Sequence, residues 1–136
     1  MACQESTPDK VTLLYRGNIY LGGAGAVFVG GILRKAGMKV KVYQDPQGAV
    51  WAKLIFSAVM NPLPVMTGQG YDVLRKDPAI WELVRKAIRE GREVSKALGV
   101  RLAFDPLELI QRVRQGDLSG IAYRGSVAHD VLAGRP

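Results

Sequence analysis

Residues 50–62, which read V-W-A-K-L-I-F-S-A-V-M-N-P, constrain the fold more than any other segment of this chain. Their apolar content predicts a helix that packs in a core, but Lys53, Ser57 and Asn61 interrupt it at intervals of four. Four residues advance an α-helix by about 400° and roughly 6 Å, so these side chains form a stripe about 12 Å long. A lysine in apolar surroundings needs water or a polar partner. The stripe is therefore either a solvated helix face, with the lysine reaching water, or the wall of a ligand-binding cleft.

The composition points to one soluble globular domain. The chain has 136 residues, of which 48% are hydrophobic and 23% charged, and this is enough for a sizeable core. Cys3 is the only cysteine and His129 the only histidine, so we expect no internal disulfide and no metal site. The polar first ten residues lack a signal-peptide core, and no apolar run approaches a membrane span. We therefore expect a cytoplasmic protein without a membrane partner.

The formal net charge of +7 raises the question of an anionic partner. The basic residues are scattered and form at most pairs, such as Arg34-Lys35, Arg75-Lys76 and Arg85-Lys86. Single-stranded nucleic acid requires a basic groove interleaved with aromatic side chains, and the sequence has none. We expect no nucleic acid, and two explanations stay open: a solvated basic surface, or a small phosphorylated or carboxylate ligand.

The first third of the chain has the pattern of a small αβ segment. Residues 1–9 are expected to be a frayed or partly ordered start. Short strands are predicted over 11–15 and 18–21 around a turn, with a third over 38–42 where apolar and basic residues alternate. A helix is predicted over 26–36, because Arg34-Lys35 and then Gly37 mark a helix end.

The rest of the chain has the pattern of a helical body. The striped helix should stop near Asn61, because Pro62 disfavours a helical residue before it, and Pro64 should keep the next stretch non-helical. Asp77-Pro78 is a strong helix start, and Asp105 is a candidate cap for a later helix. The predicted helices after the striped one cover 78–98, 106–113 and 124–133. We therefore predict a mainly α fold with two parts, an αβ segment at 1–47 with two to three strands and one helix, and a helical domain at 48–136.

The loop at 22–25 partly matches the glycine-rich fingerprint of dinucleotide-binding folds. Gly23 and Gly25 supply the first two positions of G-x-G-x-x-G, and Asp45 follows at about the distance of a ribose-binding acid. The third position is Phe28, which should obstruct close packing of helix on strand. The fingerprint is incomplete, so we expect an ordinary αβ edge here and assign no cofactor-binding residue.

Three segments together resemble one enzyme family. They are W-A-K-L-I-F-S-A-V-M-N-P followed by L-P-V-M-T-G-Q-G, then G-R-E-V-S-K-A-L-G, and G-S-V-A-H-D-V-L-A-G-R-P near the end. In this order and spacing they resemble the C-terminal domain of ketopantoate reductase (2-dehydropantoate 2-reductase). Residues 11–45, including G-N-I-Y-L-G, are also similar to the end of that family's N-terminal Rossmann domain.

The resemblance implies a helical domain of the 6-phosphogluconate-dehydrogenase-like type after a Rossmann remnant. It also implies an NADP-dependent oxidoreductase of pantothenate biosynthesis, in which NADPH reduces the ketone of ketopantoate to give pantoate. Lys53 falls on the family's catalytic lysine, Asn61 on an asparagine of the substrate cleft, and Ser126 on a serine that contacts the substrate. Hydride attack puts negative charge on the ketone oxygen, and a positioned ammonium stabilises that charge and can supply the proton.

The chain departs from the family pattern in three ways. Ser57 replaces the usual asparagine, so it stays a weaker substrate-binding candidate. The pattern continues after G-R-P with T-E, where the glutamate helps bind substrate, and that extension is absent. The glycine-rich cofactor site is absent too, so we expect the domain to be truncated and inactive alone.

Two functions follow from these departures. One is the substrate-side domain of a keto acid reductase, acting with a separate Rossmann half or as a homo-oligomer, because strand edges and apolar surface would be uncovered. The other is a non-catalytic helical module that serves dimerisation or binds an anion. The sequence does not identify the exact 2-keto acid.

Overall fold

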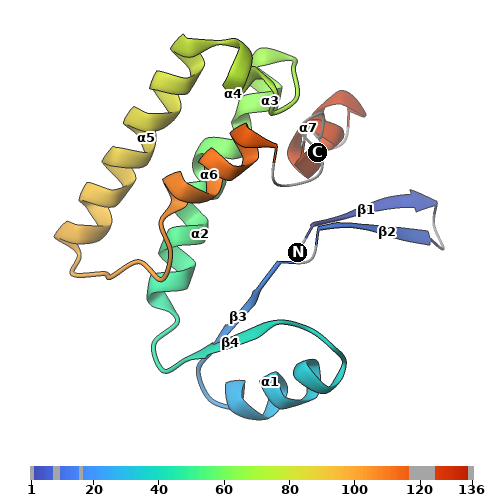
Figure 1. Ribbon diagram of the computed structural model, residues 1–136, viewed down its shortest axis with the longest axis vertical. Helices are drawn as coiled ribbons and strands as arrows, with labels where there is room; N and C mark the ends of the chain where they lie inside the picture. The colour runs from blue at the N-terminus through green and yellow to red at the C-terminus, as the bar shows by residue number, and fades with distance from the viewer. Residues whose placement is uncertain (1, 8–9, 16, 117–124, 135–136) are drawn as a thin grey trace.

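The computed structural model describes residues 2–7, 10–15, 17–116 and 125–134, and Figure 1 shows a small β-α-β unit followed by a body of helices. The predicted mainly α class, with a short αβ segment first, is confirmed.

The strands form two separate two-stranded sheets. β1 (Ala2–Thr7) pairs antiparallel with β2 (Lys10–Tyr15), so the start is ordered over these residues rather than frayed. β3 (Ile19–Gly22) pairs in parallel with β4 (Val40–Tyr43). The strands predicted over 11–15 and 18–21 therefore exist but belong to different sheets, because β3 finds its partner beyond the helix that follows it.

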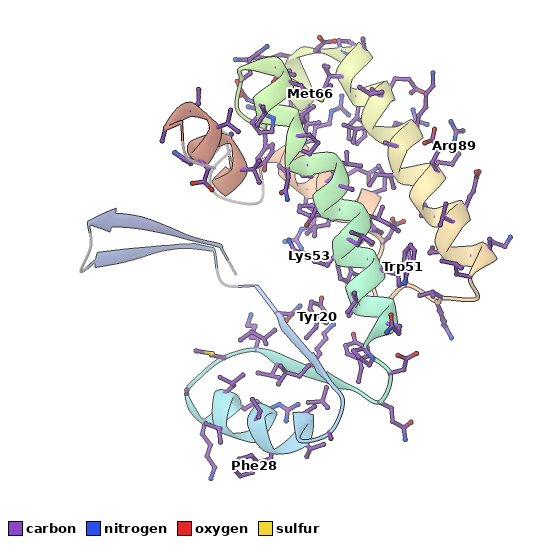
Figure 2. The ribbon with its side chains drawn as sticks, turned by 180° about the vertical axis from the view of Figure 1, so that it is seen from behind. Tyr20, Phe28, Trp51, Lys53, Met66 and Arg89 are labelled. Atoms are coloured by element: carbon purple, nitrogen blue, oxygen red, sulfur yellow. The ribbon has the colours of Figure 1, made fainter. Side chains whose placement is uncertain are left out.

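Helix α1 (Ala26–Lys35) packs against the β3–β4 sheet through its smallest residues. Ala26 and Gly30 are its buried positions, and a Cβ added to Gly30 would lie 3.0 Å from Cγ2 of Val42. Phe28 is 74% exposed and points away from the sheet, as Figure 2 shows. The prediction that Phe28 obstructs helix–strand packing was therefore wrong, because Gly30 provides the close approach.

The helical body contains six helices among the described residues. They are α2 (Gln47–Met60), α3 (Pro62–Thr67), α4 (Val73–Lys76), α5 (Pro78–Ala97), α6 (Pro106–Gln115) and α7 (Gly125–Leu132). α2 packs against α5 and α6, α4 lies against α5, and α7 contacts α3. The core between them is built from the buried side chains Ile55, Met60, Leu63, Val73, Leu74, Val84, Ile88, Ile110 and Val113.

Local capping signals fix where two of these helices begin. Asp77 Oδ1 accepts the backbone N–H groups of Ala79 (2.8 Å) and Ile80 (3.3 Å), and Asp105 Oδ1 accepts that of Leu107 (2.9 Å). A side-chain oxygen at this position satisfies N–H groups that have no partner within the helix. The predicted starts at Asp77 and Asp105 are therefore confirmed.

The stretch after Asn61 is helical, against the prediction. Asn61 itself has φ −67° and ψ −44°, and α3 begins at once with Pro62 and includes Pro64. Prolines are tolerated in a first turn because their missing N–H groups would have no intrahelical acceptor there.

Helices α2 and α3 together, Gln47–Thr67, form the one stretch of the described residues long and apolar enough to span a membrane. A core helix of a soluble protein has the same properties, and Ile55, Met60 and Leu63 belong to the core.

The β-α-β unit and the helical body meet through aromatic and backbone contacts. The ring of Tyr20 lies 5.9 Å from that of Tyr43 and 5.5 Å from that of Phe104, measured between centroids. The backbone N–H of Ala103 donates to the carbonyl of Gly48 over 3.1 Å. A Cβ at Gly48 would lie 2.2 Å from the carbonyl oxygen of Arg101, so only glycine fits at the start of α2.

Candidate active site

The polar stripe predicted from the sequence lies along one side of α2. Lys53 and Asn61 are exposed and Ser57 is half-buried, while Ala52 and Ile55 on other sides of the helix are buried. The backbone N–H of Asn61 donates to the carbonyl of Ser57 over 2.9 Å, which continues the helix to its junction with α3. The three polar side chains are thus held on one rigid element at helical spacing.

Lys53 reaches solvent and also lies against an aromatic ring. Its Nζ is 5.2 Å from the centroid of Phe56, one turn further along α2. Phe56 is half-buried and packs against the helical core. Among the described residues no carboxylate forms an ion pair with Lys53. Its ammonium is therefore free to meet an anionic group.

Apolar surface borders the stripe. Val50 is 55% exposed and Leu54 is 53% exposed, and both lie on α2 beside Lys53. Met66, on α3, is 73% exposed. Figure 2 shows Lys53 and Trp51 on different sides of α2, with Met66 toward the far end of the helical body. A ligand on the stripe would thus meet hydrogen-bond donors on one side and apolar side chains on the other.

Ser126 lies in the first turn of α7. Helix α7 packs against α3, the helix that begins directly after Asn61. The fold thus brings the helix that carries Ser126 to the Asn61 end of the stripe. The Ser126 side chain falls outside the described side chains, so its predicted contact with the substrate stays a prediction.

The described residues do not form a complete dinucleotide site. Gly23 (φ +90°) and Gly25 (φ +83°) make a left-handed turn between β3 and α1. Gly22, at the end of β3, is covered by Pro46, whose Cβ would lie 2.4 Å from a Cβ added there. Asp45 Oδ1 accepts the backbone N–H of Gln47 over 2.9 Å and so orders the entry to α2. The loop thus carries only part of the dinucleotide fingerprint, and no residue of it is assigned to NADPH.

Away from the stripe, the described residues offer a candidate cavity and no candidate metal site. A cavity of about 600 Å³ lies along α5 and not at the stripe. Its lining includes Ile88, Arg89, Arg92, Ser95, Lys96 and Leu102. Figure 2 shows Arg89 on the opposite side of the helical body from Lys53. Within the described part of the chain, no group of three or more His, Cys, Asp or Glu side chains could hold a metal ion.

Comparison with known proteins identifies the family of this chain. The model of the family described as ketopantoate reductase PanE/ApbA C terminal matches residues 45–136. The chain belongs to the ketopantoate reductase family.

Relatives of the ketopantoate reductase family agree in sequence and in fold. A 2-dehydropantoate 2-reductase from Archaeoglobus fulgidus is 27% identical over 110 residues, covering 81% of this chain and 36% of that protein. The crystal structure of a PanE/ApbA family ketopantoate reductase from Ralstonia eutropha JMP134 superposes with a TM-score of 0.81. It is 26% identical and covers 99% of this chain and 45% of its own.

A D-mandelate dehydrogenase solved with NADH shares the fold at a TM-score of 0.79 and 19% identity, and it covers 99% of this chain and 48% of its own. The chain thus spans roughly a third to a half of the length of these reductases.

Sequence reasoning missed one contributor to the site. Phe56 was treated only as one apolar residue of the striped helix, yet its ring lies beside the Lys53 ammonium. The signal was present, because residues three apart on a helix are neighbours and an aromatic ring attracts a cation.

Proposed function

We propose that this chain forms the substrate side of a 2-keto acid reductase that converts ketopantoate to pantoate. The observation that carries the proposal is the exposed stripe of Lys53, Ser57 and Asn61 on α2, within a domain of the ketopantoate reductase family. Lys53 is the proposed catalytic residue, and Asn61, Ser57 and Ser126 are the proposed substrate-binding residues.

The proposed chemistry follows from the residue types. Hydride addition to a ketone carbon leaves negative charge on the ketone oxygen. A nearby ammonium stabilises that charge and transfers a proton to the oxygen, which completes the alcohol. Lys53 has a solvent-exposed ammonium with no described ion-pair partner, so it is available for this role.

The substrate carboxylate and its apolar part require different neighbours. The Asn61 amide and the Ser57 and Ser126 hydroxyls can donate hydrogen bonds to a carboxylate. The exposed side chains of Val50 and Leu54 border the stripe and suit a branched carbon chain.

The hydride donor needs a second half of the site. The glycine loop at 22–25 carries only part of the dinucleotide fingerprint, so we propose that NADPH is held by a separate Rossmann half that docks beside the stripe. The exposed apolar face of α1, with Val27 75% and Phe28 74% exposed, supports docking of that half or assembly into a homo-oligomer. We place this enzyme of pantothenate biosynthesis in the cytoplasm.

The test is an NADPH oxidation assay with ketopantoate, using this chain alone and mixed with the Rossmann half of a ketopantoate reductase. We expect turnover in the mixture only. Lys53→Ala should lower kcat by about 10²- to 10⁴-fold, because a positioned acid contributes a factor of that order. Lys86→Ala removes an exposed lysine of α5 outside the stripe, and this control should keep the activity.

A second candidate is a non-catalytic module that binds an anion. The cavity along α5 favours it, because the basic side chains that line it outnumber the acidic ones: Arg85, Arg89, Arg92 and Lys96 against Glu82 and Glu93. If no mixture turns over ketopantoate while Lys53→Ala folds normally, the reductase proposal is wrong and this candidate remains.

A further inference from the structure

Within the described residues, the contact with the Phe56 ring is the one interaction of the Lys53 side chain, the proposed catalytic group. Nζ lies 5.2 Å from the ring centroid, inside the range of about 6 Å over which a cation is attracted to an aromatic face. Phe56 is half-buried against the helical core, so its ring is anchored while the lysine is exposed. A mobile side chain thus rests on a fixed one.

A lysine side chain has four rotatable bonds and samples many rotamers when it is exposed. The quadrupole of the Phe56 ring favours those rotamers that bring Nζ over its face. Phe56 lies one turn from Lys53 on α2, about 60° around the helix on the side away from Ser57, so these rotamers hold the ammonium at one edge of the stripe.

We propose that Phe56 is a positioning residue that holds the Lys53 ammonium at the edge of the stripe before substrate arrives. What the held ammonium acts on rests on the proposed function, but the holding itself is a property of this chain. Orientation before binding matters because catalysis depends on a group being placed where charge develops. Water and substrate can still reach the ammonium, because the ring lies on one side of it only.

The contact is tested directly by NMR on the full 136-residue chain. The Lys53 ε-methylene, assigned by comparison with Lys53→Arg, should be shifted upfield by the ring current of Phe56. The shift should disappear in Phe56→Leu, which keeps an apolar side chain, and should persist in Phe56→Tyr, which keeps a ring. Trp51→Leu removes the other ring of the same helix from a different side of α2, and this control should leave the shift unchanged.

The consequence for catalysis is tested in the mixture with the Rossmann half. Phe56→Leu should lower kcat by about two- to fivefold with KM nearly unchanged, and Phe56→Tyr should restore kcat. That factor is what one exposed cation–ring contact supplies.

These measurements separate the two proposals. A ring-current shift that depends on Phe56, in a chain inactive in every mixture, supports the positioning role and sinks only the proposed reaction. An unchanged ε-methylene shift in Phe56→Leu overturns the positioning role whatever the kinetics. An equal loss of shift in Trp51→Leu also overturns it, because the effect then comes from the fold and not from the ring.

Discussion

The β-α-β unit (residues 19–43) and the helical body (residues 47–116 and 125–132) differ in what they bury. The body encloses side chains that are almost fully buried, such as Met60, Leu74 and Ile110. Helix α1 of the unit buries only Ala26 and Gly30, while its outer face is exposed. The body therefore has a core of its own, whereas the unit has one packed face and one uncovered face.

The two parts also differ in charge. Residues 19–43 contain four basic and no acidic residues, while the body holds acids and bases on the same helices. The body thus forms its own ion pairs, such as Glu82–Arg85 and Asp105–Arg92. The comparison shows a helical body with its own core and ion pairs, joined to a unit whose outer face is exposed.

The largest expected effect is the difference in stability loss when an isoleucine of each part is replaced by alanine. Ile110→Ala removes a fully buried side chain of the body and should lower the free energy of unfolding by about 2–5 kcal/mol. Ile32→Ala on α1, where the side chain is 53% exposed, should change it by less than about 0.5 kcal/mol.

Urea unfolding measures both, with the fluorescence of Trp51 and Trp81 reporting the body and circular dichroism the whole chain. An equal loss at Ile32 would contradict the comparison, because it would mean that the outer face of α1 is covered in solution.

A smaller difference is expected between two helical glycines. Gly91 lies where α5 crosses α2, and a Cβ there would lie 2.9 Å from Cγ2 of the buried Ile55. Gly91→Ala should therefore destabilise the body by about 1–3 kcal/mol. Gly31 on α1 has nothing within 4 Å of such a Cβ, so Gly31→Ala should add up to about 1 kcal/mol through helix propensity.

Thermal unfolding of both variants checks that Gly91→Ala lowers the stability and that Gly31→Ala raises it. The Gly91 effect should shrink in an Ile55→Ala background, because the colliding side chain is gone. If Gly91→Ala is neutral in both backgrounds, the close crossing of α2 and α5 is wrong.

The parts of the fold that the sequence predicted are those set by neighbouring residues. The starts at Asp77 and Asp105 depend on a carboxylate and a proline side by side, and the Lys53 stripe depends on helical periodicity. The errors came where distant residues decide. β3 pairs across α1 with β4, and Asn61 stays helical although Pro62 follows it.

The candidate site was predictable to a similar degree. The spacing of Lys53, Ser57 and Asn61 indicated one helix face, and the structure leaves that face accessible. Periodicity did not reveal that Gly30 replaces Phe28 at the contact of helix and strand, because that depends on which side of α1 meets β4. Side-chain roles in binding stay predictions, since they depend on a ligand.

The smallest expected effect is a dependence of stability on pH. It follows from the difference in charge between the β-α-β unit and the helical body. The hydrogen bond from Lys76, reinforced by its charge, lowers the pKa of Asp72 below its ordinary value of 3.8. A carboxyl with a lowered folded pKa stabilises the fold above its unfolded pKa and loses that contribution as pH falls through the folded value. Asp72→Asn should therefore destabilise the body by at most about 1 kcal/mol at pH 7, because the pair is on the surface.

The Asp72→Asn difference should fade as the pH drops below about 4, and Lys76→Gln should show the same pH dependence without adding to it. Urea titrations of tryptophan fluorescence at stepwise lower pH measure it. A constant difference at all pH values would mean that Asp72 acts through packing and not through its charge. The β-α-β unit has no carboxylate to titrate, so acid sensitivity confined to the body would sharpen the contrast between the two parts.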